Sequence, residues 1–108
     1  PSRTISPTSA TGAALALIAN RVGFLLDLHG PSLVVDTACS SSLVALHLAA
    51  SALRAGEIEA AIVVGVNFPE PAGDEALAVA GFLADRCRVF DDSAAGYVRA
   101  AGGVALVL

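Results

Sequence analysis

Apolar residues recur every three or four positions in the first part of the chain, and this spacing predicts a helix over residues 10–26. Residues 1–11 are rich in Ser, Thr and Pro, which is typical of a loop, and Ser9 or Thr11 could cap the helix. The turn-forming stretch 27–31 predicts its end. The apolar stripe of this helix consists of Leu15, Ile18, Val22 and Leu25 or Leu26.

Continuous apolar segments in the middle and at the end of the chain predict core elements. Residues 32–36 are a short β-branched run, which we expect to form a buried strand, and residues 58–66 and 102–108 are predicted as two further strands. Residues 40–55 are apolar nearly all round, which predicts a buried helix that stops at Gly56.

The remaining residues lie between the last two predicted strands. Residues 67–73 carry two prolines and are predicted as a loop, residues 74–80 as a short helix, and residues 84–97 as an irregular, turn-rich segment. The order helix, strand, helix, strand, short helix, strand indicates an α/β layered architecture, with a sheet covered on both faces.

The composition suggests a segment of a larger protein. Of 108 residues, 56% are hydrophobic and only 15% are charged, against about 25% charged in typical domains. Such a chain is too apolar to be disordered and has few charges to cover its own surface. It begins at Pro1, contains no Met, and ends in the apolar run 101–108. We therefore expect an internal piece of a longer chain.

Charge and hydropathy argue against several classes of protein. A net charge of −4 and an acidic pI of 4.8 are unfavourable for binding nucleic acid. The apolar runs are shorter than the roughly 20 residues of a membrane span, and no signal peptide is visible. Two cysteines do not make a disulfide framework. The sequence thus predicts a cytoplasmic protein in a reducing environment, without nucleic-acid or membrane partners.

Cys39 is the strongest candidate for chemistry, because it lies where the predicted strand 32–36 passes into the predicted helix 40–55. Unpaired N–H groups and the helix dipole favour negative charge at a helix N-terminus, which favours the nucleophilic thiolate there. The same N–H groups could hold an oxyanion formed by attack on a thioester or ester. The alternative is a small buried side chain, as free cysteines often are.

A general base for Cys39 is not evident among the two histidines. His47 lies eight positions along the same predicted helix, roughly 12 Å away along its axis. It is better explained as a core or interface side chain. His29 lies in the turn before the strand 32–36, and we expect it at the opposite end of that strand from Cys39. The sequence therefore offers a nucleophile without a base.

Other chemical candidates are weaker. Cys87 stands between Arg86 and Arg88 in a turn-rich stretch, without a helix start behind it, and is interpreted as an incidental thiol. The adjacent acidic pairs 74–75 and 91–92 are interpreted as solvated. The cysteines and histidines do not have the spacing of a zinc site, so no metal is expected.

The segment DTACSSSLVALHLA at 36–49 resembles the active-site segment of the ketosynthase (β-ketoacyl synthase) domain of type I modular polyketide synthases. Three further parts resemble the same family, in its order and spacing, so that the resemblance covers essentially the whole chain. They are ANRVGFLLDLHGPS (19–32), AAIVVGVNF (60–68), and DRCRVFD followed by GYVR (85–91 and 96–99).

This resemblance implies a thiolase-like fold in which residues 1–108 form part of the N-terminal half of a ketosynthase domain. It implies that Cys39 accepts an acyl chain as a thioester and that its backbone N–H donates to the oxyanion. The acyl chain would arrive on the phosphopantetheine of an acyl carrier protein, and a malonyl-type extender would condense with it. The chain itself would bind no cofactor, and the intact domain would be a homodimer. Two catalytic histidines would lie past Leu108, and neither His29 nor His47 matches them.

Four positions depart from the family pattern. Ala95, Ala100 and Ala101 stand where the family usually has Asp, Gly and Glu around its Gly-Tyr-Val-Arg motif, and Val64 stands where it usually has Gly in the strand. Two alternatives to a functional ketosynthase therefore stay open. One is a non-catalytic or decayed ketosynthase that serves dimerisation or docking. The other sets the resemblance aside and treats the chain as an α/β binding module that folds alone.

Overall fold

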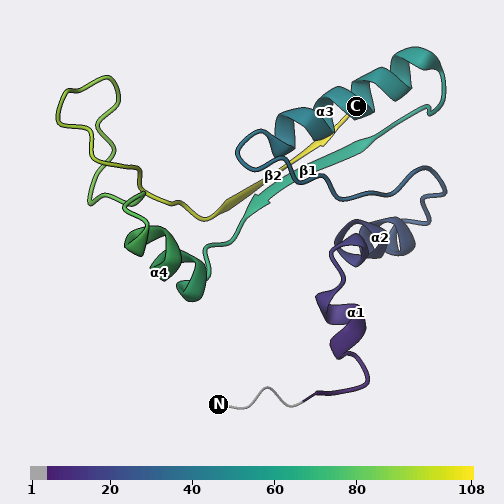
Figure 1. The fold of residues 1–108 in the computed structure, drawn as a ribbon. Coiled ribbons are helices and arrows are strands. Elements are labelled where there is room, and N and C mark those ends of the chain that lie inside the picture. Colours follow the sequence, from purple (N-terminus) through teal and green to yellow (C-terminus); the bar gives the residue numbers. More distant parts are fainter. Residues whose placement is uncertain (1–4) are drawn as a thin grey trace. The chain divides into compact units, whose positions relative to one another are not determined.

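The structure is a computed structural model that describes residues 5–108 and separates into two units. Among the described residues, the first unit is 5–61 together with Leu108, and the second is Ile62–Val107. The first carries the helices α1 (Ser9–Ala13), α2 (Ala16–Leu25) and α3 (Ser41–Ala55), and the second carries β1 (Ile62–Asn67), α4 (Pro71–Val79) and β2 (Gly102–Val107) (Figure 1).

The predicted helix 10–26 is interrupted in the structure. The backbone at Ala14 is extended, with ψ of 113°, so α1 ends there and α2 starts again at Ala16. Gly12 weakens the first part, because glycine costs about 1 kcal/mol relative to alanine within a helix. The expected cap Ser9 lies inside α1, and the N-cap is Thr8, whose carbonyl accepts a hydrogen bond from the Thr11 hydroxyl at 3.0 Å.

The strand predicted over residues 32–36 is not formed in the structure. The structure shows no ladder pairing there, and Leu33 is 54% exposed. A strand requires a neighbour that accepts and donates its backbone hydrogen bonds. Within the residues that the structure describes, the only sheet is two-stranded and is formed by β1 and β2.

Helix α3 has the predicted C-terminal boundary but not the predicted burial. Gly56 adopts φ of 72°, and the N–H groups of Gly56 and Glu57 donate to the carbonyls of Leu53 and Ala52 at 3.1 and 3.0 Å. This left-handed glycine cap satisfies two carbonyls of the last turn. However, no residue of α3 is buried, and Leu43 is 70% exposed. A helix that is apolar all round needs neighbours on every side, and residues 5–108 do not enclose it.

Strands β1 and β2 lie side by side and antiparallel (Figure 1), with Ile62 opposite Val107 and Asn67 opposite Gly102. Val63, which is 7% exposed, is the one buried hydrophobic side chain among the described residues. The predicted strand 58–66 begins later than expected. Ala61 and Leu108 exchange backbone hydrogen bonds of 3.1 and 2.9 Å, so the residues before Ala61 have no pairing partner here.

The segment between the strands is held by polar contacts. Helix α4 begins at Pro71, three residues before the predicted start, because proline suits the first helical position, where its missing N–H costs nothing. Arg99 pairs with Asp74 in the first turn of α4, so Asp74 is not simply solvated as expected. The side-chain amide of Asn67 donates to the Ala100 carbonyl at 2.6 Å. The backbone next to Ala101 is therefore tied to the end of β1.

Candidate active site

Cys39 lies two residues before α3, with Ser40 between it and the first helical residue as the N-cap. Its thiol is free and exposed within residues 5–108. The position is where the sequence predicted a nucleophile, at the entrance of the apolar helix. The partial positive charge of the helix N-terminus stabilises negative charge at this place.

The residue before the thiol has an unusual backbone conformation. Ala38 adopts φ of 56°, in the left-handed region, which costs a non-glycine residue about 1–2 kcal/mol. A carboxylate supports the turn, because Oδ1 of Asp36 accepts a hydrogen bond from the Ala38 N–H at 3.0 Å. Asp and Asn commonly stabilise turns in this way, by bonding to the backbone two residues ahead.

Hydroxyl groups fix the other peptide groups of the turn. Ser40 Oγ donates to the Thr37 carbonyl at 2.9 Å and lies 2.8 Å from Thr37 Oγ1. Ser41 Oγ accepts from the Thr37 N–H at 2.9 Å and donates to the Ala38 carbonyl at 2.6 Å. The sequence did not predict these hydrogen bonds. The Asp and Thr before Cys39, together with the Ser residues after it, were the available signal for this network.

The turn leaves donors open beside the thiol. Neither the Cys39 N–H nor the Ser40 N–H has a hydrogen-bond acceptor among residues 5–108. The Ser41 N–H, the first of α3, donates to the Ala38 carbonyl at 3.1 Å, and the Val44 N–H donates to the Ser40 carbonyl at 3.0 Å. An exposed thiol next to open N–H groups can combine nucleophilic attack on a carbonyl with stabilisation of the resulting oxyanion.

The structure brings no histidine to Cys39 within the described part of the chain. His29 Nε2 lies 3.1 Å from Asp27 Oδ1, and both side chains are exposed. His47 lies on α3, none of whose residues is buried among residues 5–108, and its interpretation as a core or interface side chain stays a prediction.

The second thiol has different surroundings. Cys87 is free and exposed in the irregular segment between α4 and β2. Its neighbour Arg88 donates to Ser93 Oγ at 3.0 Å. The Ser93 hydroxyl and backbone N–H both donate to Asp91, which holds the pKa of that carboxyl below its usual value. The Cys87 N–H also has no acceptor among residues 5–108. No helix starts after Cys87, however, so no helix dipole favours negative charge there.

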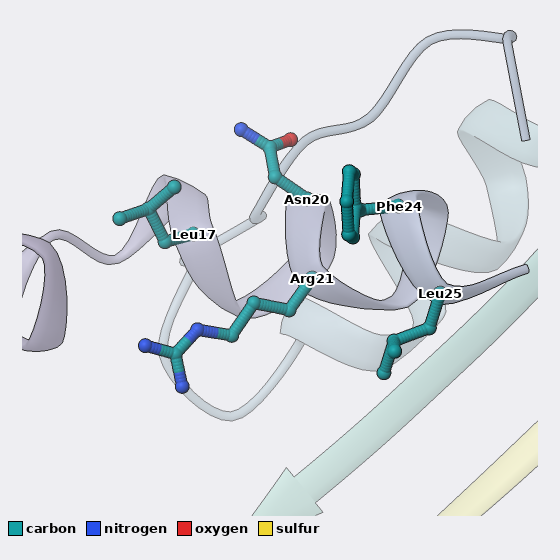
Figure 2. A pocket seen from close by; sticks show the side chains of 5 residues that line it. All are labelled: Leu17, Asn20, Arg21, Phe24 and Leu25. Atoms are coloured by element: carbon teal, nitrogen blue, oxygen red, sulfur yellow. The ribbon is translucent and has the colours of Figure 1, made fainter. Parts of the chain in front are cut away.

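One depression of the surface lies over residues of α2 and is not lined by Cys39. It measures about 520 Å³ and lies over a single helix, α2, so it is an open apolar surface (Figure 2). Phe24 and Leu25 within it are 88% and 80% exposed. A binding pocket is a cleft or cavity that buries most of the surface of its ligand, whereas this surface is open. Its lining residues are Leu17, Asn20, Arg21, Phe24 and Leu25.

One segment is apolar enough to cross a membrane by length and composition alone. It is Ala38–Ala55, 18 residues with a mean hydropathy of 1.2. The helix within it, α3, has 15 residues, fewer than the roughly 20 that a span needs. Core helices of soluble proteins have the same composition, so this feature does not distinguish the two cases.

The order of an exposed thiol before an apolar helix, then a strand, a short helix and an antiparallel strand, is shared with thiolase-like condensing enzymes of known structure. The backbone of this chain matches solved ketosynthases. The oxazolomycin ketosynthase domain of Streptomyces albus is 46% identical with a TM-score of 0.82, over 87% of this chain and 17% of that one. The ketosynthase of module 6 of the bacillaene synthase from Bacillus subtilis is 42% identical with a TM-score of 0.85, over 90% and 18%.

The chain belongs to the β-ketoacyl synthase family, because all of residues 1–108 match the model of the beta-ketoacyl synthase N-terminal domain. Two curated relatives are fumosorinone synthetase of Cordyceps fumosorosea, 52% identical over 93% of this chain, and polyketide synthase ThaG of Burkholderia thailandensis, 50% identical over 95%. The chain spans only 2% of the length of each of these relatives. It corresponds to part of a ketosynthase domain of the polyketide synthase type.

Proposed function

We propose that residues 1–108 are the nucleophile-bearing part of a β-ketoacyl synthase of polyketide biosynthesis, an acyltransferase that forms carbon–carbon bonds. The observation that carries the proposal is the exposed thiol of Cys39 at the start of α3, beside N–H groups without an acceptor. Family membership supports it. The activity belongs to the intact domain that contains this segment.

The first half-reaction is acyl transfer to Cys39. The thiolate sulfur attacks the carbonyl carbon of an acyl thioester, and the charge moves onto the carbonyl oxygen. The Cys39 N–H stabilises this oxyanion. When the tetrahedral intermediate collapses, the bond from carbon to the donor sulfur breaks, and the released thiolate takes up the proton that Cys39 lost. The acyl group is then held as a thioester on Cys39.

The second half-reaction is a decarboxylative condensation. A malonyl-type thioester loses carbon dioxide, and the electron pair left on its α-carbon attacks the carbonyl carbon of the Cys39 thioester. The new carbon–carbon bond forms as the bond to the Cys39 sulfur breaks, which regenerates the nucleophile. The N–H that faced the first oxyanion serves the second intermediate as well. The product is a β-ketoacyl chain, two carbons longer in its backbone.

The partners are inferred from the ketosynthase family, to which the chain belongs. Both thioesters would be presented on the phosphopantetheine of an acyl carrier protein, so the chain needs no cofactor of its own. The intact domain would act as a homodimer in the cytoplasm. The histidines that assist decarboxylation would come from outside residues 1–108, since His29 pairs with Asp27 and His47 projects from the middle of α3.

A second candidate is a non-catalytic ketosynthase that serves dimerisation or docking. The substitutions at Ala95, Ala100 and Ala101 favour it. Against it, the Ala100 carbonyl accepts a hydrogen bond from Asn67, and β1 pairs with β2 without interruption. Alanine at these positions is therefore compatible with an ordered approach to β2.

The two candidates are separated by condensation in the intact domain. We expect wild-type protein, supplied with an acyl thioester and a malonyl-loaded carrier protein, to release carbon dioxide and form a β-ketoacyl carrier, as measured by mass spectrometry. Cys39→Ala should abolish condensation, whereas Cys87→Ala should leave it unchanged. A folded wild-type domain without condensation activity would support the non-catalytic candidate. Condensation that survives Cys39→Ala would refute the proposal.

A further inference from the structure

We propose that Ser41 is a positioning residue, which orients the backbone N–H of Cys39 toward the reacting carbonyl. The inference rests on the proposed ketosynthase function and concerns a residue that does not touch the substrate. Its basis is the way in which one hydroxyl group connects two peptide groups of the turn before the nucleophile.

Ser41 holds the Ala38 carbonyl with two donors. Its hydroxyl donates to that oxygen at 2.6 Å, and its backbone N–H donates to the same oxygen at 3.1 Å. The hydroxyl oxygen also accepts from the Thr37 N–H at 2.9 Å. The Ser41 side chain thus connects the peptide group between Asp36 and Thr37 with the one between Ala38 and Cys39. The left-handed residue Ala38 lies between these two peptide groups.

The direction of the Cys39 N–H follows from this anchor. The Ala38 carbonyl and the Cys39 N–H belong to one planar trans peptide group, so they point in opposite directions. A carbonyl drawn toward Ser41 therefore turns the N–H away from it. That N–H has no acceptor among the described residues, so it remains available to an oxyanion.

The neighbouring serines do not hold this peptide group. The Ser40 hydroxyl donates to the Thr37 carbonyl, which belongs to the preceding peptide. The Ser42 side chain makes no hydrogen bond within the described residues. Ser42→Ala is therefore a matched control, one position further along the same helical turn.

The test measures acylation of the intact ketosynthase domain by an acyl N-acetylcysteamine thioester. We expect Ser41→Ala to lower the maximal rate of acyl-enzyme formation by about 10- to 100-fold, the scale on which a misplaced catalytic group acts. The half-saturating donor concentration should change by less than about twofold, because ground-state binding does not use this N–H. Ser41→Thr keeps the hydroxyl and should restore the rate, and Ser42→Ala should leave it unchanged.

Alkylation by iodoacetamide distinguishes positioning from general damage. This reaction needs the Cys39 thiolate but forms no oxyanion, so its rate should be the same in Ser41→Ala and wild type. Equal acylation rates in the two proteins would overturn the inference, and so would a parallel fall in acylation and alkylation. Acylation that survives Cys39→Ala would instead refute the proposed function.

Hydrogen exchange in the wild-type domain keeps the inference testable if Ser41→Ala does not fold. The Thr37 amide donates to Ser41 Oγ, whereas the Ser40 amide has no acceptor within residues 5–108. We expect the Thr37 amide to exchange at least about tenfold more slowly than the Ser40 amide, since its hydrogen bond must open first. Equal exchange rates of the Thr37 and Ser40 amides would contradict the hydrogen bond from Thr37 to Ser41 and the inference that rests on it.

Discussion

Around Cys39, the conformation of single residues determines what the thiol can reach. Ala38 stands in the left-handed region, and Asp36 and Ser41 bind its peptide groups from both sides. Such a conformation persists only when its surroundings hold it, and residues of this kind gather at functional sites. The turn therefore keeps the thiol and its adjacent N–H in one arrangement before a substrate arrives.

Ala38 provides a test at this scale. In the intact domain, Ala38→Val should lower the free energy of unfolding by about 1–3 kcal/mol, because a β-branched side chain is strongly disfavoured at positive φ. Acyl loading should fall with it. Ala38→Gly is the control, since glycine adopts this conformation freely. Denaturant unfolding and loading rates check both, and a valine variant as stable as the glycine variant would contradict the assigned conformation.

The sequence was sufficient to single out Cys39 but not its supporting network. A thiol between an apolar run and an apolar helix can be located from pattern alone, because both boundaries are marked by composition. The bonds of Asp36 and Ser41 depend on the φ of Ala38, and alanine gives no sign of a left-handed backbone. Asp, Thr and Ser beside the thiol were visible, but which peptide group each would bind was not.

At the scale of elements, the ends marked by glycine and proline were partly predictable. Gly56 ends α3 as expected, because glycine readily adopts the left-handed conformation that caps the last turn of a helix. Pro71 was assigned to a loop, although it is the first residue of α4, since proline is compatible with both. The strand predicted over residues 32–36 is absent for another reason, since a sequence of strand composition forms a strand only where a neighbouring strand can pair with it.

The irregular segment before β2 has a tight contact that can be tested. Gly96 adopts φ of 139°, and a Cβ atom there would lie 2.6 Å from the Phe82 carbonyl oxygen. Gly96→Ala should lower the free energy of unfolding of the intact domain by about 2–3 kcal/mol, because backbone must move to admit the methyl group. The Tyr97 N–H, which donates to that same carbonyl at 3.0 Å, should lose protection from hydrogen exchange.

Gly23→Ala is the matched control for this prediction. Gly23 lies within α2, and the nearest atom to its added Cβ is the Leu28 carbonyl oxygen at 3.9 Å. This replacement should be neutral or stabilising by up to about 1 kcal/mol, through higher helix propensity. An equal loss of stability in the two variants would show that the contact at Gly96 is not the cause.

At the scale of the whole molecule, the main property is the exposure of large apolar side chains. Val63 is buried, whereas large side chains such as Phe24, Leu43 and Val107 are between 70 and 88% exposed. The sequence indicated this through its low charge content. The chain spans 17 to 20% of the solved ketosynthase chains it matches, and we attribute the open faces to surfaces that the rest of such a domain would cover. The residues that would form those covering surfaces cannot be predicted from these 108 residues.

The central claim is that Cys39, and not the other free thiol, carries the acyl group. The most direct measurement is peptide mapping by mass spectrometry, after the intact domain has reacted with an acyl thioester. We predict one added acyl mass, on the peptide that contains Cys39, and an unmodified peptide containing Cys87, because Cys39 stands at a helix start and Cys87 does not. Acylation at Cys87 alone, or equal acylation of both thiols, would contradict the account.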